Sequence, residues 1–188
     1  MTVPVRESAR KRELLDAAYA YVAEHGMVDM SLRPLADAVG SSPRVLLFLF
    51  GSKDQLIQAL LARAREDELA SLQQIDISSA GGVSGTALRV WRWLSSPGHR
   101  RLLMLWAEGY ARSLIDPAGP WAGFARQTVD DWLDILAAAQ PPAQRRTRAG
   151  ATERTLALSV LRGSLLDLLA TGDERRVTVA VRSYFSGT

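Results

Sequence analysis

One short stretch of the chain, SSPRVLLFLFGSKDQL at residues 41–56, combines side chains that can bind a nucleic acid. Arg44 carries a planar guanidinium, whose paired N–H donors match the O6 and N7 acceptors of a guanine base. Ser42 and Lys53 lie where helices are predicted to begin, and the free backbone N–H groups of a helix N-terminus favour phosphate. The pattern indicates contacts to base edges and to the phosphate backbone.

Patterns for catalysis or metal binding are much weaker. His25 and His99 are isolated from each other and the chain has no cysteine, so no thiolate site and no spaced His pair can be identified. No glycine-rich phosphate loop is present. A Ser-His-Asp triad stays open as an alternative, because its members are brought together only in space. We expect a protein that is not an enzyme and has no cofactor and no metal.

The composition is that of a globular protein. The chain has 188 residues, of which 47% are hydrophobic, and its net charge is only +3, which favours one or two folded domains over disorder. The absence of cysteine excludes a disulfide-stapled secreted scaffold. No segment resembles a signal peptide or an apolar span of about 20 residues. We therefore expect a cytoplasmic protein without a membrane partner.

The spacing of apolar residues predicts helices throughout, and therefore an all-α fold. Serine N-caps and glycine stops bound the first four helices, predicted over residues 8–25, 32–39, 43–50 and 53–72. Further helices are predicted over residues 86–94, 98–114, 121–139, 152–170 and 173–185. A strand is the alternative for the apolar run 45–50, but Val45 is its only β-branched residue and no second strand is available to pair with it.

The second and third helices, joined by a turn at Gly40, form a candidate helix-turn-helix. The buried face of its second helix is predicted to consist of Val45, Leu46, Leu49 and Phe50. Arg44, Leu47 and Phe48 are then left facing outward. Leu47 and Phe48 cannot hydrogen-bond a base, but they can contact the methyl group of thymine; the alternative is that they pack on the first helix.

The segment LLDAAYAYVAEHGMVDMSLRPLADAVGSSPRVLLFLFGSKDQL resembles the DNA-binding domain of the tetracycline-repressor (TetR) family of transcription regulators. The matching features include Ala17-Ala18, Gly26, Ser31-Leu32, Leu35-Ala36, Val39-Gly40-Ser41, Phe50 and Ser52-Lys53-Asp54-Gln55-Leu56. The resemblance implies a helix-turn-helix domain over residues 1–55 and a helical effector-binding and dimerisation domain over residues 56–188. It also implies three partners: a double-stranded DNA operator, a small-molecule effector and a second copy of the chain.

The resemblance gives roles to single residues near the predicted turn. The candidate DNA contacts are Ser31, Arg33, Ser42, Pro43, Arg44, Leu47, Phe48 and Lys53. The family usually has Tyr, which contacts a phosphate, where Leu47 stands, so this contact is expected to be missing. Where Arg44 stands the family often has Gly, which makes Arg44 the candidate base reader. Arg6, Arg10, Lys11 and Arg12 are expected either to reach DNA as an arm or to form an ordinary solvated terminus.

The predicted role is that of a ligand-responsive repressor that binds a palindromic operator as a homodimer. A helical protein-interaction module that has lost tight DNA binding is the alternative, favoured by Leu47 and by the low net charge of the first third of the chain. The absence of enzymatic motifs fits both.

The helix around LLMLWAEGY, residues 102–110, is apolar on nearly all sides and is predicted to be central. Candidate effector-binding residues are Trp91, Met104, Trp106, Glu108, Tyr110, Phe124 and Trp132. The aromatic side chains suit a lipophilic or aromatic molecule, with Glu108 as a polar contact. The alternative is that these side chains form ordinary core.

The last two predicted helices are candidates for a dimer interface. Leu158, Leu161, Leu165, Leu168 and Leu169 span an arc that is predicted to be too wide for one buried face. Ser159 and Gly163 form a strip of small residues where another helix can approach closely. The candidate interface residues are Ser159, Gly163, Leu166, Val177, Ala180, Val181 and Tyr184, in a two-fold four-helix bundle. The alternative is that these faces close the core of a single chain.

Overall fold

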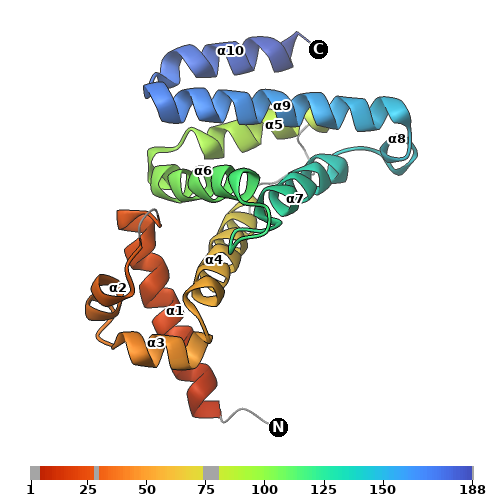
Figure 1. Ribbon diagram of the computed structural model, residues 1–188. Helices are drawn as coiled ribbons and strands as arrows, with labels where there is room; N and C mark the ends of the chain where they lie inside the picture. The colour runs from red at the N-terminus through yellow and green to blue at the C-terminus, as the bar shows by residue number, and fades with distance from the viewer. Residues whose placement is uncertain (1–4, 28–29, 74–80, 188) are drawn as a thin grey trace. The chain divides into compact units, whose positions relative to one another are not determined.

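The computed structural model describes residues 5–27, 30–73 and 81–187, and every regular element within them is a helix. The predicted all-α fold is therefore confirmed. In chain order (Figure 1), the elements are α1 (Val5–His25), α2 (Leu32–Ala38), α3 (Pro43–Phe50), α4 (Lys53–Gln73), α5 (Gly82–Leu94), the 3-10 helix η1 (Pro97–His99), α6 (Arg100–Ile115), α7 (Phe124–Ala138), α8 (Pro142–Arg145), α9 (Arg148–Thr171) and α10 (Glu174–Ser186).

The sequence located the first four helices closely and the later helix starts less well. The helix predicted from residue 86 begins at Gly82, and α8 was not predicted at all. The helix predicted from residue 152 begins at Arg148, because the Thr147 hydroxyl accepts the N–H of Gly150 at 3.0 Å and caps it there.

Contacts between residues divide the chain into two compact units. The first contains Met1–Glu68 and Met104–Ala125, and the second contains Leu69–Leu103 and Arg126–Thr188. The second half of α6 thus belongs to the unit that contains α1, α2 and α3. The boundary expected between residues 55 and 56 does not coincide with either division between these units, and as a boundary between functions it stays a prediction.

In the first unit, α1, α2 and α3 pack into a three-helix group (Figure 1). Leu46 and Phe50, four residues apart on α3, are buried, and Leu49 is half-buried. Val45 was predicted to be buried with them, but 40% of its surface is exposed. The reason is helical geometry: Val45 lies about 100° around the helix from Leu46, outside the arc that packs on the neighbouring helices.

Two polar side chains join α1 to α4 within this unit. The Tyr19 hydroxyl donates to Asp67 Oδ2 at 3.1 Å, and Arg63 Nε donates to Asp16 Oδ1 at 3.0 Å. Arg63 also pairs with Asp67 at 3.3 Å. Burial, followed by the Asp67 carboxylate, raises the pKa of Tyr19 well above its ordinary value, so this hydroxyl remains a hydrogen-bond donor.

The second half of α6 is attached to α1 and packed closely against α4. Glu108 Oε2 accepts the backbone N–H of Met27 at 3.0 Å, just beyond the end of α1. Gly109 lies against Leu61 and Phe124 with no room for a side chain.

The helix around residues 102–110 was predicted to be central, and within it Leu103, Leu105 and Trp106 are buried. Met104, Leu114 and Ile115 are exposed. They lie on the side of α6 that the packing of this helix leaves uncovered.

In the second unit, α5, α9 and α10 lie side by side (Figure 1). The Trp91 indole N–H donates to the Thr178 hydroxyl at 3.0 Å and so joins α5 to α10. Arg176 of α10 makes a paired hydrogen bond to the Asp167 carboxylate of α9, at 2.6 and 2.9 Å. That guanidinium holds the pKa of Asp167 below its usual range.

The leucines of α9 do not need a partner chain for their burial. Leu158, Leu161, Leu165 and Leu168 are all buried within the unit, and Leu169 is half-buried. The inference that their arc is too wide for one chain is therefore wrong, because α5 and α10 both pack on this helix.

A buried amide organises the corner between α7 and α9. Gln140 is 2% exposed, and its Nε2 donates to Glu153 Oε2 at 2.7 Å and to the Gly150 carbonyl at 3.1 Å. Arg154 donates to Gln140 Oε1. Gly150 fits here because an added Cβ would lie 2.2 Å from the Gln144 carbonyl oxygen.

We predict that Gly109→Ala destabilises the fold. The new Cβ would lie 2.9 Å from Phe124 Cε1 and 3.1 Å from Leu61 Cδ2. Overpacking of this kind costs about 1–3 kcal/mol, which the better helix propensity of Ala offsets only in part. Urea unfolding followed by circular dichroism measures the change.

Gly98→Ala is the matched control, because the nearest neighbour of its added Cβ is Ser96 Oγ at 3.9 Å. We expect this change to alter the free energy of unfolding by less than about 0.5 kcal/mol. Equal effects of the two substitutions would contradict the close packing at Gly109.

Candidate nucleic-acid interface

A glycine turn connects α2 to α3. Gly40 has a φ of +61°, the left-handed conformation that glycine adopts without strain. The Ser41 N–H then donates to the Ala36 carbonyl at 2.8 Å, and the Gly40 N–H donates to Asp37 at 3.2 Å. These bonds close the end of α2 and direct the chain into α3.

Both ends of α3 are fixed by local interactions. At its start, Ser42 Oγ accepts the N–H of Val45 at 3.3 Å, and Pro43 occupies the first turn. At its end, Gly51 has a φ of +88°. Ser52 Oγ then accepts the N–H of Gln55 at 3.1 Å, which starts α4. The caps predicted from the sequence at Ser42 and Ser52 are therefore present.

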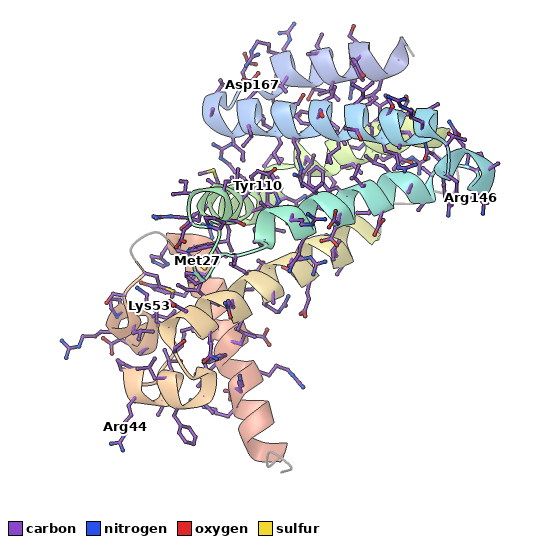
Figure 2. The ribbon with its side chains drawn as sticks, turned by 45° about the vertical axis from the view of Figure 1, so that its right-hand side comes forward. Met27, Arg44, Lys53, Tyr110, Arg146 and Asp167 are labelled. Atoms are coloured by element: carbon purple, nitrogen blue, oxygen red, sulfur yellow. The ribbon has the colours of Figure 1, made fainter. Side chains whose placement is uncertain are left out.

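Three side chains share the exposed side of α3. Arg44, Leu47 and Phe48 follow each other at intervals of three and one residues, which places them on one face of a helix. Phe48 is 76% exposed and Leu47 is 37% exposed. Figure 2 shows Arg44 projecting away from the ribbon. The outward orientation predicted for these residues agrees with the structure, whereas their contact with DNA stays a prediction.

The other candidate DNA contacts lie at or near helix N-termini. Ser31, Arg33, Ser42 and Lys53 are exposed, and Pro43 is partly exposed. Ser31 occupies the N-cap position of α2, although its side chain makes no capping hydrogen bond. Its hydroxyl is therefore not used to cap the helix.

Part of the basic arm is bound to its own chain. Arg10 pairs with Glu13 at 2.8 Å, and the ammonium of Lys11 lies 5.2 Å from the centre of the Phe50 ring. The side chain of Arg6 lies outside the described residues. Arg10, Lys11 and Arg12 are nevertheless all exposed, so both an arm that reaches DNA and a solvated terminus stay predictions.

The seven candidate effector residues belong to different units. Met104, Trp106, Glu108, Tyr110 and Phe124 are in the first unit, and Trp91 and Trp132 are in the second. Neither unit by itself brings the seven together.

The candidates in the first unit are mostly engaged in packing. Trp106 is buried and lies 5.2 Å from Tyr110 between ring centres, and Phe124 covers Gly109. Glu108 contacts the end of α1, and half of the surface of Met104 is exposed.

Trp132 lines a small apolar cavity in the second unit. The other lining residues are Leu72, Val90, Ile135, Leu136 and Leu161, and the volume is about 10 Å³. Such a cavity holds about one water molecule. Beside it, the Arg162 guanidinium lies 5.2 Å from the centre of the Trp132 ring and donates to the Thr128 hydroxyl at 3.2 Å. Arg162 was not singled out from the sequence, because one arginine within a leucine-rich helix resembles an ordinary surface residue.

A larger groove, of about 560 Å³, lies on the surface of the second unit. It is lined by Val83, Ser84, Arg148, Ala149, Thr152, Glu153, Leu156, Ala157 and Tyr184. Only Tyr184 had been singled out from the sequence, because the groove joins α5, α9 and α10 across about 100 residues of chain.

The candidate dimer residues fall into two groups. Ser159, Gly163, Leu166, Ala180 and Tyr184 are exposed. Val177 and Val181 are only 2% and 1% exposed, so their expected place on a face open to a partner is wrong. Four residues apart on α10, these two valines pack on their own chain. Leu156 and Val179 are exposed apolar residues that the sequence analysis missed.

Among the residues that the structure describes, no group of three or more His, Cys, Asp or Glu side chains could hold a metal ion. No described helix is by itself long and apolar enough to cross a membrane. The helices Pro43–Phe50 and Lys53–Leu72, which are bent by 72° relative to each other, reach a membrane-spanning length and apolar composition only when they are counted together.

Comparison with known proteins bears on both the helix-turn-helix segment and the fold. Residues 14–60 match the family described as bacterial regulatory proteins, tetR family. The HTH-type transcriptional regulator BetI from Brucella canis is 27% identical over 138 residues, which make up 71% of this chain and 55% of BetI. The chain thus spans about half the length of the curated relatives it matches.

Solved structures share the fold at low sequence identity. A transcriptional regulator from Rhodococcus sp. Rha1 has a TM-score of 0.73 at 20% identity, covering 94% of this chain and 96% of that one. The multidrug binding protein EbrR, complexed with proflavin, has a TM-score of 0.68 at 23% identity, covering 93% and 98%. EbrR has also been solved with malachite green.

The likeness to these structures shows the fold alone. The matched segment and the related sequences support a tetR-family transcriptional regulator, with the family match confined to residues 14–60 of this chain.

Proposed function

We propose that the protein is a DNA-binding transcriptional regulator, not an enzyme, that reads an operator through α3. The observation that carries this proposal is the exposed face of Arg44, Leu47 and Phe48, on a helix fixed at both ends within the tetR segment. The relatives named above are transcriptional regulators, which supports a non-enzymatic role.

Arg44 and Lys53 would have different tasks. Arg44 lies in the first turn of α3, where side chains of a recognition helix meet base edges. Lys53 begins α4, where a cation and free backbone N–H groups together suit a phosphate. Between residues 31 and 53 the chain has three cations and one carboxylate, so the phosphate attraction is modest and base contacts must supply most of the discrimination.

The exposed apolar residues also fit the second candidate, a module that binds another protein. Phe48 and Leu47 favour it, because large apolar side chains are common at protein interfaces. The cation in the first turn of α3 and the absence of any acidic residue on this helix favour DNA.

We further propose repression that is relieved by a small lipophilic or aromatic effector bound in the second unit. The apolar cavity beside Trp132 supports this site, although its volume of about 10 Å³ requires expansion before a drug-sized molecule can enter. An effector acts only if it prefers one arrangement of the protein. The hydrogen bond from Met27 to Glu108 is a route by which a shift of α6 would reach α1.

The dimer would form through the exposed side of α9 and α10. On α9, Leu156 and Leu166 lie five residues on either side of Leu161, and Ser159 and Gly163 lie two residues on either side. If two copies of α9 pack antiparallel about a two-fold axis at Leu161, Leu156 of one chain lies against Leu166 of the other, and Ser159 lies against Gly163. The small residues then meet at the centre, where the helices are closest. Two-fold symmetry would call for a palindromic operator.

Arg44→Ala is predicted to cost about 1–3 kcal/mol on a specific duplex and to relax specificity at the base it reads. Lys53→Ala should weaken binding to all sequences similarly and reduce the salt slope by about one. Fluorescence anisotropy at several salt concentrations separates the two effects. If Arg44→Ala left specific binding unchanged, Arg44 would not read a base.

Malachite green is predicted to bind the protein in the absence of DNA, as judged by isothermal titration. Val90→Phe should abolish this binding, because Val90 lines the cavity and a phenyl ring would fill it. Val45→Phe, at an exposed valine of the first unit, should leave binding intact. Binding that survives Val90→Phe, in a variant shown by circular dichroism to be folded, would place the effector elsewhere.

Cysteine cross-linking tests the dimer register, and the chain has no cysteine of its own. A mixture of Leu156→Cys and Leu166→Cys chains is predicted to form a disulfide-linked dimer on oxidation, because the two positions meet across the axis. Each variant alone should form little. Leu114→Cys, exposed in the first unit, mixed with Leu166→Cys is the control and should not cross-link. Strong cross-linking of either single variant would rule out this register.

A further inference from the structure

The exposed face of α3 is mostly apolar. Phe48 is 76% exposed, and Val45 and Leu47 are 40% and 37% exposed. Arg44 is the only charged residue on the helix. Neighbouring apolar side chains held in water at a functional surface are unfavourable until a ligand covers them.

These side chains have a defined order along the helix. Arg44 lies in the first turn and Phe48 one turn later, a rise of about 6 Å. Base pairs of DNA repeat every 3.4 Å or so, so a guanidinium and a phenyl ring on this face reach positions about two base pairs apart. Leu47 lies beside them, one residue before Phe48.

The chemistry of the major groove limits what Phe48 and Leu47 can recognise. Neither side chain can donate or accept a hydrogen bond. All the recognition groups on base edges in this groove are donors or acceptors, except the C5-methyl group of thymine. An apolar side chain that enters the groove therefore gains free energy mainly by covering a thymine methyl.

We propose that Phe48, supported by Leu47, is a specificity-determining residue that reads thymine methyl groups beside the guanine contacted by Arg44. This inference rests on the proposed function and adds to it which bases the operator contains. Each half-site contains a guanine and, about two base pairs away, one or more thymines whose methyl groups face the major groove.

The charge of the surface agrees with this assignment. Arg33, Arg44 and Lys53 are the cations between residues 31 and 53, and Asp37 is the only carboxylate there. Such an excess of cations favours the phosphates that border a groove, while the apolar side chains of α3 would face the bases. Figure 2 shows the Arg44 side chain directed away from the ribbon.

The experiment begins with the full chain and a pool of random duplexes of about 30 base pairs, enough for two half-sites one helical turn apart. Duplexes enriched at low salt are remade with deoxyuridine in place of each thymine in turn. This change removes only the methyl group and keeps every donor and acceptor. We expect about a fourfold loss of affinity for each methyl that the wild-type protein covers.

Three variants show which side chain covers the methyl. Phe48→Ala is expected to bind the thymine duplex more weakly and to lose the deoxyuridine penalty. Arg44→Ala is expected to bind more weakly but to keep the penalty. Ile115→Ala is the matched control, because Ile115 is 77% exposed but lies at the end of α6, and it should behave as the wild type.

The outcomes are distinguishable. Enriched duplexes that bind equally well with deoxyuridine at every position would overturn the methyl readout while leaving the regulator proposal intact. A penalty that persists in Phe48→Ala would also overturn it, provided that the variant melts at the wild-type temperature. If no duplex is enriched, both proposals fail, and a protein ligand for this face becomes the better explanation.

Discussion

The burial of Leu46 and Phe50 is the packing constraint on which the exposed face of α3 depends. The two side chains are four residues apart on one side of the helix, and α3 packs on both α1 and α2. Only one rotation of α3 about its axis satisfies both contacts. That rotation leaves Arg44 and Phe48 in solvent. Gly40 and Gly51, both with positive φ, allow the chain to enter and leave the helix sharply enough to keep this rotation.

The second half of α6 is part of the same packing unit, which bears on how a regulator of this kind could respond to a ligand. Glu108 holds the N–H just beyond α1, and Gly109 lets α6 press against Leu61 of α4. Tyr19 and Arg63 tie α4 back to α1. A movement of α6 therefore has two routes to the three-helix group that holds α3 and Arg44, one through α1 and one through α4.

The sequence alone predicted the parts of the structure that depend on neighbouring residues. Serine caps located the starts of α3 and α4, and glycines located the ends of the first three helices, because those signals act within four residues. The outward orientation of Arg44, Leu47 and Phe48 followed from helical periodicity. The effector candidates were less well predicted, since aromatic residues look alike whether they line a cavity or fill a core. Trp91, for example, donates its indole N–H to Thr178 instead of facing an open pocket.

The same limit explains the errors at the end of the chain. The number of leucines on α9 does not distinguish a helix covered by two neighbours in its own chain from a helix that needs a second chain. In this protein α5 and α10 cover the leucines. What the structure adds is the opposite side of α9, where Leu156 and Leu166 flank two small residues in solvent. The pattern reads alike in both directions about Leu161, so a helix that met its own copy about a two-fold axis at this level would pair like with like. The leucines that are buried within the chain and the symmetric pattern on the exposed side are therefore different residues of α9.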